Sequence, residues 1–365
     1  MAGSTFGNQF KIMTWGESHG AGVGVVIDGC PAGIPLAESD IQVMLNKRKP
    51  GQSKYTTPRK EDDEVEILSG IFEGKTTGTP ISMVVRNKTQ RSADYSEIAR
   101  FYRPGHADYT FDEKFGFRDY RGGGRSSGRE TIGRVAAGAI AMKILKELGI
   151  NITAYAKEIG GIGIDYDKFD IAERDNNAFN MPDKEAAEMV KSFAESKMSV
   201  GDSIGGVIEC RVTGMMTGIG NPTFEKLDAN LAKAIMSIGA VKGVEIGDGF
   251  SVTSSKGSIN NDSFISENGQ VLKQTNHSGG ILGGISDGSS IILRAAIKPT
   301  PSISQPQKTV NTAGENIEIA ISGRHDPVIV PRAVVVVESM AAITLTDLLM
   351  QNMTSRIEYL KNIYL

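Results

Sequence analysis

The chain has 365 residues, of which 39% are hydrophobic, and its formal net charge at pH 7 is −3. A chain of this length can bury a large core, whereas its acidic balance argues against a general nucleic-acid binder or a membrane-surface protein, because these carry a basic excess. Only two cysteines are present, Cys30 and Cys210, so a disulfide framework is excluded and a reducing compartment is favoured.

Apolar runs flanked by glycine predict several β-strands. These runs are "VGVVIDG" (23–29), "VEILSGIFEGK" (65–75), "PISMVVRN" (80–87) and "SIILRAAIK" (290–298). Within the second run, "GIFEGKT" resembles a P-loop. Only three residues separate its glycines where that motif has four, so we expect a strand–turn–strand there.

Helical periodicity predicts helices over 38–49, 183–198 and 222–238, the first starting near Ser39. The apolar run 333–343 is interrupted by Glu338 and is too short to span a membrane. The N-terminal "MAGSTFGNQF" does not have the pattern of a signal peptide, so we expect a cytoplasmic protein without a membrane segment. Strands and helices alternate, which indicates a mixed α and β class.

The stretch "RGGGRSSGRET" (121–131) leads into the best-defined helix. Ser127 and Glu130 match an S-x-x-E capping box, and the apolar residues from Ile132 to Leu148 follow helical spacing. The free N–H groups and the positive dipole end at such a helix start bind anions. The alternative is an ordinary glycine turn with a helix cap. An RGG-type RNA element is disfavoured, because such elements occur in disordered repeats.

Positive charge is concentrated locally, with seven arginines between Arg100 and Arg134. A positive site inside an acidic protein indicates a small, highly anionic ligand. "NKRKPGQSK" (46–54) is a further basic element, for which a solvated helix end is the alternative. A second glycine-rich loop, "GGILGGISDGSS" (279–290), and "KPTPS" (298–302) would let the backbone approach a flat ligand closely.

Three of the four histidines lie in polar or glycine-flanked motifs: "WGESHGAG" (His19), "RPGHADYT" (His106) and "SGRHDPV" (His325). This setting favours a functional role for at least two of them. We interpret His277 as structural. HExxH and paired-cysteine patterns are absent, so we expect no metal site.

Together these motifs resemble the chorismate synthase family. "GESHG", "NKRKPGQS", "QRSADY", "RPGHADYT", "DYRGGGRSSGRET", "SIGAVKGVEIGDGF", "GGILGGIS" and "GRHDPVIVPRAV" follow the family's order over nearly the whole chain. The resemblance implies one domain (1–365) with an α+β fold, a β-α-β sandwich. It also implies a homotetramer that converts 5-enolpyruvylshikimate-3-phosphate to chorismate with loss of phosphate. The family needs reduced FMN for this 1,4-elimination although the reaction has no net redox change. Because the sequence contains no dinucleotide-binding fingerprint, we expect an external system to reduce the flavin.

The resemblance also implies residue roles. His19 matches a general acid near the leaving phosphate, His106 matches a histidine near the flavin ring, and Asp326 matches an acid that assists proton removal near flavin N5. The positions that match FMN contacts are Arg125, Ser126, Ser127, Gly239, Ala240, Gly283, Lys298, Pro299, Thr300, Pro301, Ser302 and Arg324. The candidates for binding anionic groups are Arg48 (substrate or NADPH) and, for substrate, Arg103, Arg129, Arg134 and Arg332.

The sequence departs from the family pattern at four positions. Gly128 replaces a usual alanine, Lys54 a frequent arginine and Val335 a frequent proline, while Gly239 stands where a larger residue is common and would contact FMN only through its backbone. A flavin reductase and a non-catalytic anion-binding protein remain the alternatives. A reductase would need a hydride-donor site, and the sequence contains no dinucleotide-binding fingerprint.

Overall fold

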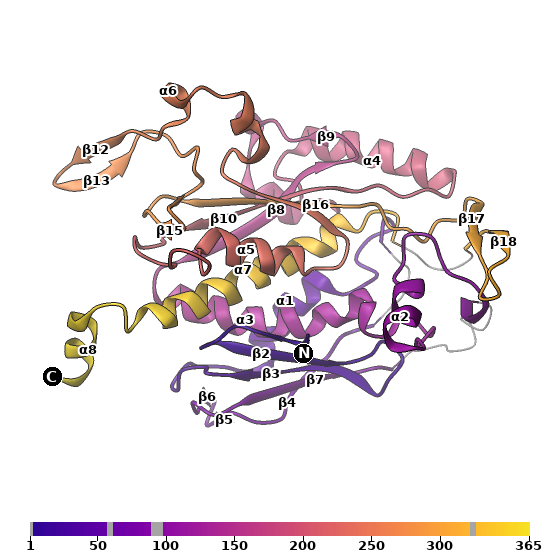
Figure 1. Cartoon of the computed structure of the whole chain (residues 1–365), viewed down its shortest axis with the longest axis horizontal. Coiled ribbons are helices and arrows are strands. Elements are labelled where there is room, and N and C mark those ends of the chain that lie inside the picture. Colours follow the sequence, from indigo (N-terminus) through magenta and orange to yellow (C-terminus); the bar gives the residue numbers. More distant parts are fainter. Residues whose placement is uncertain (1–2, 57–60, 89–97, 322–325) are drawn as a thin grey trace.

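Two five-stranded antiparallel sheets enclose a layer of helices (Figure 1). The computed structural model describes residues 3–56, 61–88, 98–321 and 326–365. The arrangement is an α+β sandwich of sheet, helices and sheet, which confirms the predicted fold class.

The first sheet has the strand order β1-β2-β3-β7-β4. Its strands are β1 (Thr5–Phe6), β2 (Lys11–Gly16), β3 (Gly22–Asp28), β4 (Val65–Ile67) and β7 (Ile81–Arg86). Register pairs Ile12 with Ile27 and Val25 with Met83, and all four side chains are buried. Alternate residues therefore face the helices, as the period of two requires.

The second sheet has the order β11-β16-β10-β8-β9. Its strands are β8 (Asn151–Ile159), β9 (Ile162–Gly163), β10 (Gly206–Thr213), β11 (Val241–Ile246) and β16 (Ile291–Ile297). Cys210 pairs with Leu293 on one side and with Ala154 on the other, and none of the three is exposed. The thiol is thus part of the core, and burial raises its pKa.

The enclosed layer holds four helices: α1 (Glu38–Arg48), α3 (Thr131–Glu147), α5 (Leu227–Met236) and α7 (Val330–Asn352). Helices α3 and α7 cross at Gly138, where a Cβ would lie 2.3 Å from that of Ser339. Only glycine permits this approach. Helix α5 begins five residues later than predicted, because residues 222–226 form a loop before the N–H of Leu227 binds the carbonyl of Gly284 at 2.8 Å.

Helix α7 corrects the expectation for the run 333–343. The helix has 23 residues, and by length and composition alone it could cross a membrane, but 89% of its apolar window is buried inside the protein. The helix continues beyond Ile343 because buried polar residues keep their hydrogen bonds within it; Thr344 Oγ1, for example, donates to the carbonyl of Met340 at 2.8 Å. It is the core helix of the sandwich.

Short elements surround these layers. The remaining helices are α2 (Asp108–Phe115), α4 (Lys184–Ser199), α6 (Gly257–Asn260) and α8 (Ile357–Tyr364), with 3-10 turns at Ile98–Arg100, Gly124–Ser126, Gly128–Glu130, Tyr166–Lys168, Ile171–Asn176 and Gly249–Ser254. Four hairpins are formed by β5 (Ile71–Phe72) with β6 (Lys75–Thr76), β12 (Phe264–Glu267) with β13 (Gln270–Lys273), β14 (Ile281–Leu282) with β15 (Ile285–Ser286), and β17 (Gln307–Val310) with β18 (Asn316–Ile319). The β5–β6 hairpin confirms the strand–turn–strand prediction and excludes a P-loop.

Candidate active site

The glycine-arginine loop packs directly against the "GESHG" motif. Gly122, Gly123 and Gly124 have φ values of 66°, 84° and 52°, a region that favours glycine. A Cβ at Gly122 would lie 2.4 Å from the imidazole of His19, which is buried and contacts Ser18 Oγ through Nδ1 at 3.1 Å. The loop can therefore close over His19 only without a side chain at position 122.

The predicted capping box after this loop is wrong. The Ser127 hydroxyl accepts a long bond of 3.4 Å from the N–H of Arg129 and begins a 3-10 turn, and α3 starts only at Thr131. The Glu130 carboxylate pairs with Arg134 Nε at 3.0 Å. The nearby arginine at i+4 thus takes the carboxylate that the box requires.

Arg125 anchors the loop to the end of strand β2. Its guanidinium donates to Thr14 Oγ1 at 2.7 Å and to the carbonyl of Gly16 at 3.1 Å. Among the described residues no carboxylate pairs with it, so its charge is not neutralised. Ser126 is exposed, and its hydroxyl donates to the carbonyl of Gly123 at 2.7 Å.

His106 lies against the "KPTPS" segment. Its Nδ1 donates to the carbonyl of Pro104 at 3.0 Å, so Nε2 of the neutral ring accepts from Ser302 Oγ at 2.9 Å. Burial, followed by the charge of Arg103, lowers the pKa of His106 from 6.5 to about 4. The imidazole is therefore neutral at pH 7.

The "KPTPS" segment joins this histidine to the loop after α5. The side-chain ammonium of Lys298 donates to the carbonyl of Gly105 at 2.7 Å. The backbone N–H of Lys298 donates to the carbonyl of Ala240 at 2.9 Å. Ala240 has a φ of 74°, and a Cβ on Gly239 would meet nothing within 4 Å. The structure thus brings Gly239, Ala240 and the segment 298–302 together beside His106.

Arg134 connects this group to the arginine loop, since it donates to the hydroxyl and the carbonyl of Ser237 at 2.6 and 3.1 Å. Gly283 is separated from Ser237 by the length of helix α5. The N–H of Leu227, at the start of α5, binds the carbonyl of Gly284, whereas Ser237 ends the same ten-residue helix. About 15 Å of helix lies between them. A contact of Gly283 with the same ligand therefore stays a prediction.

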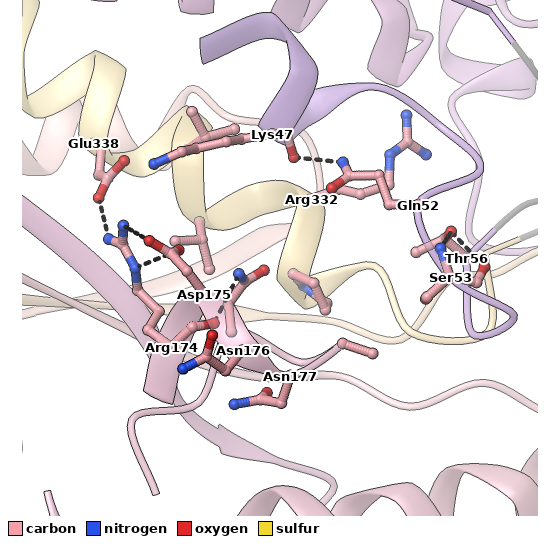
Figure 2. A pocket seen from close by; sticks show the side chains of 15 residues that line it. Lys47, Gln52, Ser53, Thr56, Arg174, Asp175, Asn176, Asn177, Arg332 and Glu338 are labelled. Atoms are coloured by element: carbon pink, nitrogen blue, oxygen red, sulfur yellow. Dashed lines mark hydrogen bonds and ion pairs between the residues drawn. The ribbon is translucent and has the colours of Figure 1, made fainter. Parts of the chain in front are cut away.

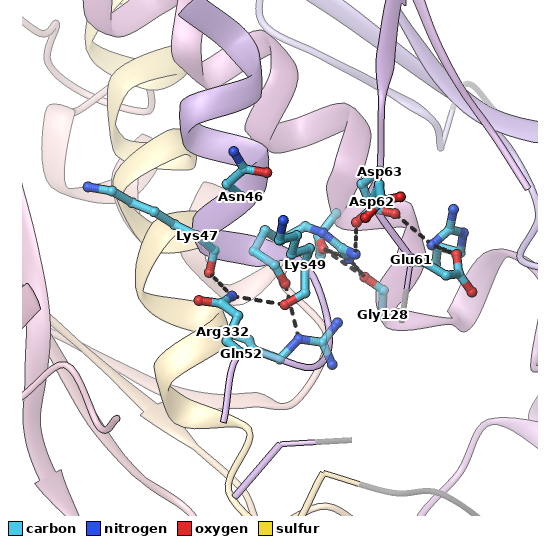
Figure 3. Close-up of polar contacts among 12 residues, drawn as sticks. Asn46, Lys47, Lys49, Gln52, Glu61, Asp62, Asp63, Gly128 and Arg332 are labelled. Carbon is cyan, nitrogen blue, oxygen red and sulfur yellow. Dashed lines mark hydrogen bonds and ion pairs between the residues drawn. The ribbon is translucent and has the colours of Figure 1, made fainter. Parts of the chain in front are cut away.

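Three of the predicted anion-binding arginines are linked by polar contacts where α1, α3 and α7 meet. Figure 3 labels Arg332 and the Asp63 and Gly128 that the other two contact. Arg48 binds Asp63 at 2.6 Å and donates to the carbonyl of Gly128 at 3.3 Å. Arg129 binds the other oxygen of Asp63 at 2.9 Å. Arg332 donates to the carbonyl of Arg48 at 3.1 Å and binds the predicted catalytic acid, Asp326, at 2.5 Å.

The predicted anion-binding arginines differ in the exposure of their side chains and in the groups that already bind them. The side chain of Arg48 is only 2% exposed, so it supports its neighbours from within rather than from the surface of the site. Arg103 is held by Asp108 through two bonds of 2.8 Å. Arg134 is occupied by Glu130 and Ser237. The roles of these residues in binding a ligand stay predictions.

Sequence reasoning missed the acidic partners. Asp63 and Glu61 lie in "KEDDE", a run that is typical of a solvated surface, yet the Asp63 carboxylate is fully buried. The only local signal is the closeness of this run to the basic stretch 46–54. Arg324 and His325 lie outside the described residues. His277 binds Asp248 at 2.6 Å, its N–H donates to Asp262 at 2.7 Å, and within the described residues none of its side-chain bonds reaches a predicted site residue.

A cavity of about 610 Å³ lies beside Arg332, between α1, the segment 174–180 and α7 (Figure 2). Of the predicted site residues, only Arg332 lines it. Figure 2 shows Glu338 bound to Arg174, with Asp175 on the same guanidinium. The cavity therefore adjoins the candidate active site without containing its histidines.

The sandwich of two sheets around shared helices, with a glycine-arginine loop packed on a buried histidine, is that of a class of α+β enzymes of known structure. A solved structure described as chorismate synthase has a TM-score of 0.77 and 31% identity, covering 98% of this chain and 96% of that one. The family model for chorismate synthase matches residues 10–350.

Curated relatives named chorismate synthase include proteins of Lachnospira eligens (81% identical over all of both chains) and Lachnoclostridium phytofermentans (66%, all of both chains). A more distant relative of the same name, from Methanococcoides burtonii, is 56% identical and covers 95% of this chain and 96% of its own. The chain therefore belongs to the chorismate synthase family, whose members are carbon–oxygen lyases that act on a small-molecule substrate.

Proposed function

We propose that the protein converts 5-enolpyruvylshikimate-3-phosphate to chorismate and phosphate, the last common step of the shikimate pathway to the aromatic amino acids, with reduced FMN as cofactor. The observations that carry the proposal are the packing of the glycine-arginine loop on His19 of "GESHG", where a Cβ at Gly122 would lie 2.4 Å from the imidazole, and the bond between His106 and Ser302 at 2.9 Å. Family membership supports it over a flavin reductase or a non-catalytic anion-binding protein.

The residues present fit a flavin mononucleotide. Gly239 leaves open space beside the left-handed Ala240, so a planar group can approach the backbone there. The Thr300 hydroxyl is buried and has no hydrogen-bond partner in the described chain. Arg125 has a charge that no described carboxylate neutralises, which suits a phosphate. Arg125, Ser126, Ser127, Gly239, Ala240 and Lys298 to Ser302 would hold the group, while Gly283 and Arg324 stay predictions from the resemblance.

The chain's own residues bind, orient and move protons. In the reaction a C–O bond to phosphate and the C–H bond at C6 both break, so phosphate and a proton leave. His19 would donate a proton to the departing phosphate, and Asp326 would assist removal of the C6 proton. Neutral His106 presents a fixed dipole rather than a charge to the cofactor. Reduced FMN, when bound, supplies electron density to the breaking C–O bond and recovers it.

Arg129 and Arg332 would bind the phosphate and the two carboxylates of the substrate. The buried Arg48 would support them from within the protein. We also propose a cytoplasmic homotetramer that depends on a separate flavin-reducing system. Exposed apolar side chains on the hairpin β12–β13 and on α8, among them Phe264, Val271, Ile363 and Tyr364, support association.

The test is an anaerobic assay of phosphate release and chorismate absorbance, with FMN far below substrate. We expect many turnovers per reduced FMN and none with oxidised FMN in air. His19→Ala and His106→Ala should each lower turnover by ~10²-fold or more without loss of the fold. Product that stops at one equivalent per flavin would contradict the cofactor's role, and turnover without flavin would refute the proposal.

A further inference from the structure

Asp63 is held in an uncommon backbone conformation between the loop after α1 and strand β4. Its φ of 50° lies in the left-handed region, which aspartate adopts more readily than most residues. Its side chain has no exposed surface. The fold therefore places a charged group inside the protein, at a position fixed by the backbone.

Each oxygen of this carboxylate binds a different guanidinium. Oδ2 accepts from Arg48 at 2.6 Å, and Oδ1 accepts from Arg129 at 2.9 Å. Burial alone would raise the pKa of Asp63, but the charges of Arg48 and then Arg129 lower it below its ordinary value. One ionised carboxylate thus ties the end of α1 to the turn that precedes α3 (Figure 3).

The contacts of Arg129 engage two of the three nitrogens of its guanidinium. Nε donates to Asn87 Oδ1 at 2.7 Å, while NH1 binds Asp63 and also Glu61. No residue in the described ranges binds NH2. A guanidinium whose position is fixed through Nε and NH1 offers the N–H groups of NH2 to a carboxylate or phosphate with little loss of side-chain entropy.

We propose that Asp63 is a positioning residue of the elimination: it holds Arg129 by NH1 so that NH2 is left to bind an anionic group of the substrate. The inference rests on the proposed function, in which Arg129 binds that group. The opposite possibility is that Asp63 stands in for a substrate carboxylate and must be displaced. Displacement would leave the buried Arg48 without its charged partner, which is strongly unfavourable.

The two possibilities predict opposite changes in substrate affinity. Asp63→Asn keeps the shape of the side chain and removes its charge. We expect KM for the substrate, and the inhibition constant of inorganic phosphate, to rise at least about tenfold, while kcat changes less. A fall in KM would mean that Asp63 competes with substrate, and an unchanged KM would mean that it has no part in binding; either result overturns the inference.

The matched control is Asp62→Asn, which removes the same charge from the adjacent, exposed residue. Its side chain binds no residue in the described chain, since only its backbone carbonyl accepts a bond, from Gln42. KM should stay within about twofold of the wild-type value. An equal rise in KM for this variant would assign the effect to general charge and overturn the inference.

A double-mutant cycle separates positioning from a merely structural role. In an Arg129→Ala background, Asp63→Asn should raise KM no further, because the residue acts through Arg129. An equal additional rise in that background overturns the inference. If Asp63→Asn alone does not fold, Arg48→Met with Asp63→Asn removes the unpaired buried guanidinium. This double variant should still show at least about a tenfold higher KM than Arg48→Met, and equal KM values would overturn the inference.

Failure of the proposed function has a different signature. A wild-type protein that releases no phosphate with reduced FMN refutes the function itself. A wild-type KM in Arg129→Ala refutes the role of that arginine. An active enzyme that is weakened by Arg129→Ala but not by Asp63→Asn refutes the inference on Asp63 alone.

Discussion

At the scale of single residues, Gly122 and His106 show how local contacts define the candidate active site. Gly122 lies where a Cβ would overlap the imidazole of His19, and its φ is positive. His106 is fixed by one carbonyl and one hydroxyl, with its proton on Nδ1. In both cases one or two local contacts determine the position of a predicted catalytic group.

Gly122→Ala should destabilise the protein by about 2 kcal/mol or more, because it combines an unfavourable φ with a steric overlap. It should also lower turnover by displacing His19. Urea denaturation and the anaerobic assay measure the two effects. Gly128→Ala is the control: its Cβ would meet nothing within 4 Å, and its φ is not positive. The control should change stability by no more than ~1 kcal/mol; equal effects of the two variants would contradict the argument.

His106 should make stability depend on pH between about 4 and 6.5. Its pKa is lower in the folded protein than in the unfolded chain, so the unfolded chain binds more protons in this window and stability rises with pH. The contribution is present in full above 6.5, and on the order of 3 kcal/mol is lost as the pH falls to 4. Urea denaturation of wild type and His106→Asn across this range measures it. The same pH slope in both proteins would exclude His106 as its source.

At the scale of secondary-structure elements, a buried ion pair ties helix α7 to the second sheet. Glu338 lies in the middle of the helix, and its Oε1 accepts from the N–H of Ala154 at 2.8 Å and from Arg174 at 2.9 Å. Burial raises the pKa of Glu338, while the bond from Ala154 and the charge of Arg174 oppose this rise. The pair thus connects the core helix to strand β8 and to the segment after it.

Arg174→Met should lower the free energy of unfolding by about 3 kcal/mol or more at pH 7, since it leaves a buried carboxylate unpaired. The loss should shrink at lower pH: a carboxyl with a raised folded pKa contributes stability while it is protonated, and that contribution disappears as the pH rises. Urea denaturation from pH 4 to 7 measures this. The control is Lys191→Met, in an exposed pair on α4, with an expected change below about 0.5 kcal/mol. A loss that does not vary with pH would argue against the ionisation of Glu338 as its cause.

At the scale of the whole molecule, both sheets share one layer of helices. Helix α3 contacts β3 of the first sheet and also α7, and α7 packs on β8 and β10 of the second (Figure 1). A shared core of this kind couples the stability of the two halves. It supports one domain over 1–365, which the family resemblance also implies.

A single cooperative unfolding transition is therefore expected. The only tryptophan, Trp15, lies on β2 in the first sheet, so its fluorescence reports on that half, whereas far-UV circular dichroism reports on both. The two urea transitions should coincide. An earlier loss of Trp15 fluorescence with most ellipticity retained would indicate two domains.

Local patterns were sufficient to predict several elements. The strands at 23–29 and 80–87 and the helices at 38–49 and 183–198 appear within one or two residues of their predicted bounds, because period and flanking glycines act over short distances. Motif order was sufficient for the family. The prediction for α5 failed at its start and the capping box failed at Glu130, because contacts with Gly284 and with Arg134 override local propensity.

Contacts between distant parts of the chain decided the rest. His106 meets Ser302 across 196 positions, and Arg129 meets Asp63 across 66. The burial of α7 depends on helices α1, α3 and α5 and on strands β8 and β10, which come from distant parts of the sequence. Residue types and spacing show which chemical groups are available, since these are properties of short segments. Which carboxylate neutralises which arginine, and which arginine keeps an unbound nitrogen, depends on how those segments pack, and packing is set by the whole core.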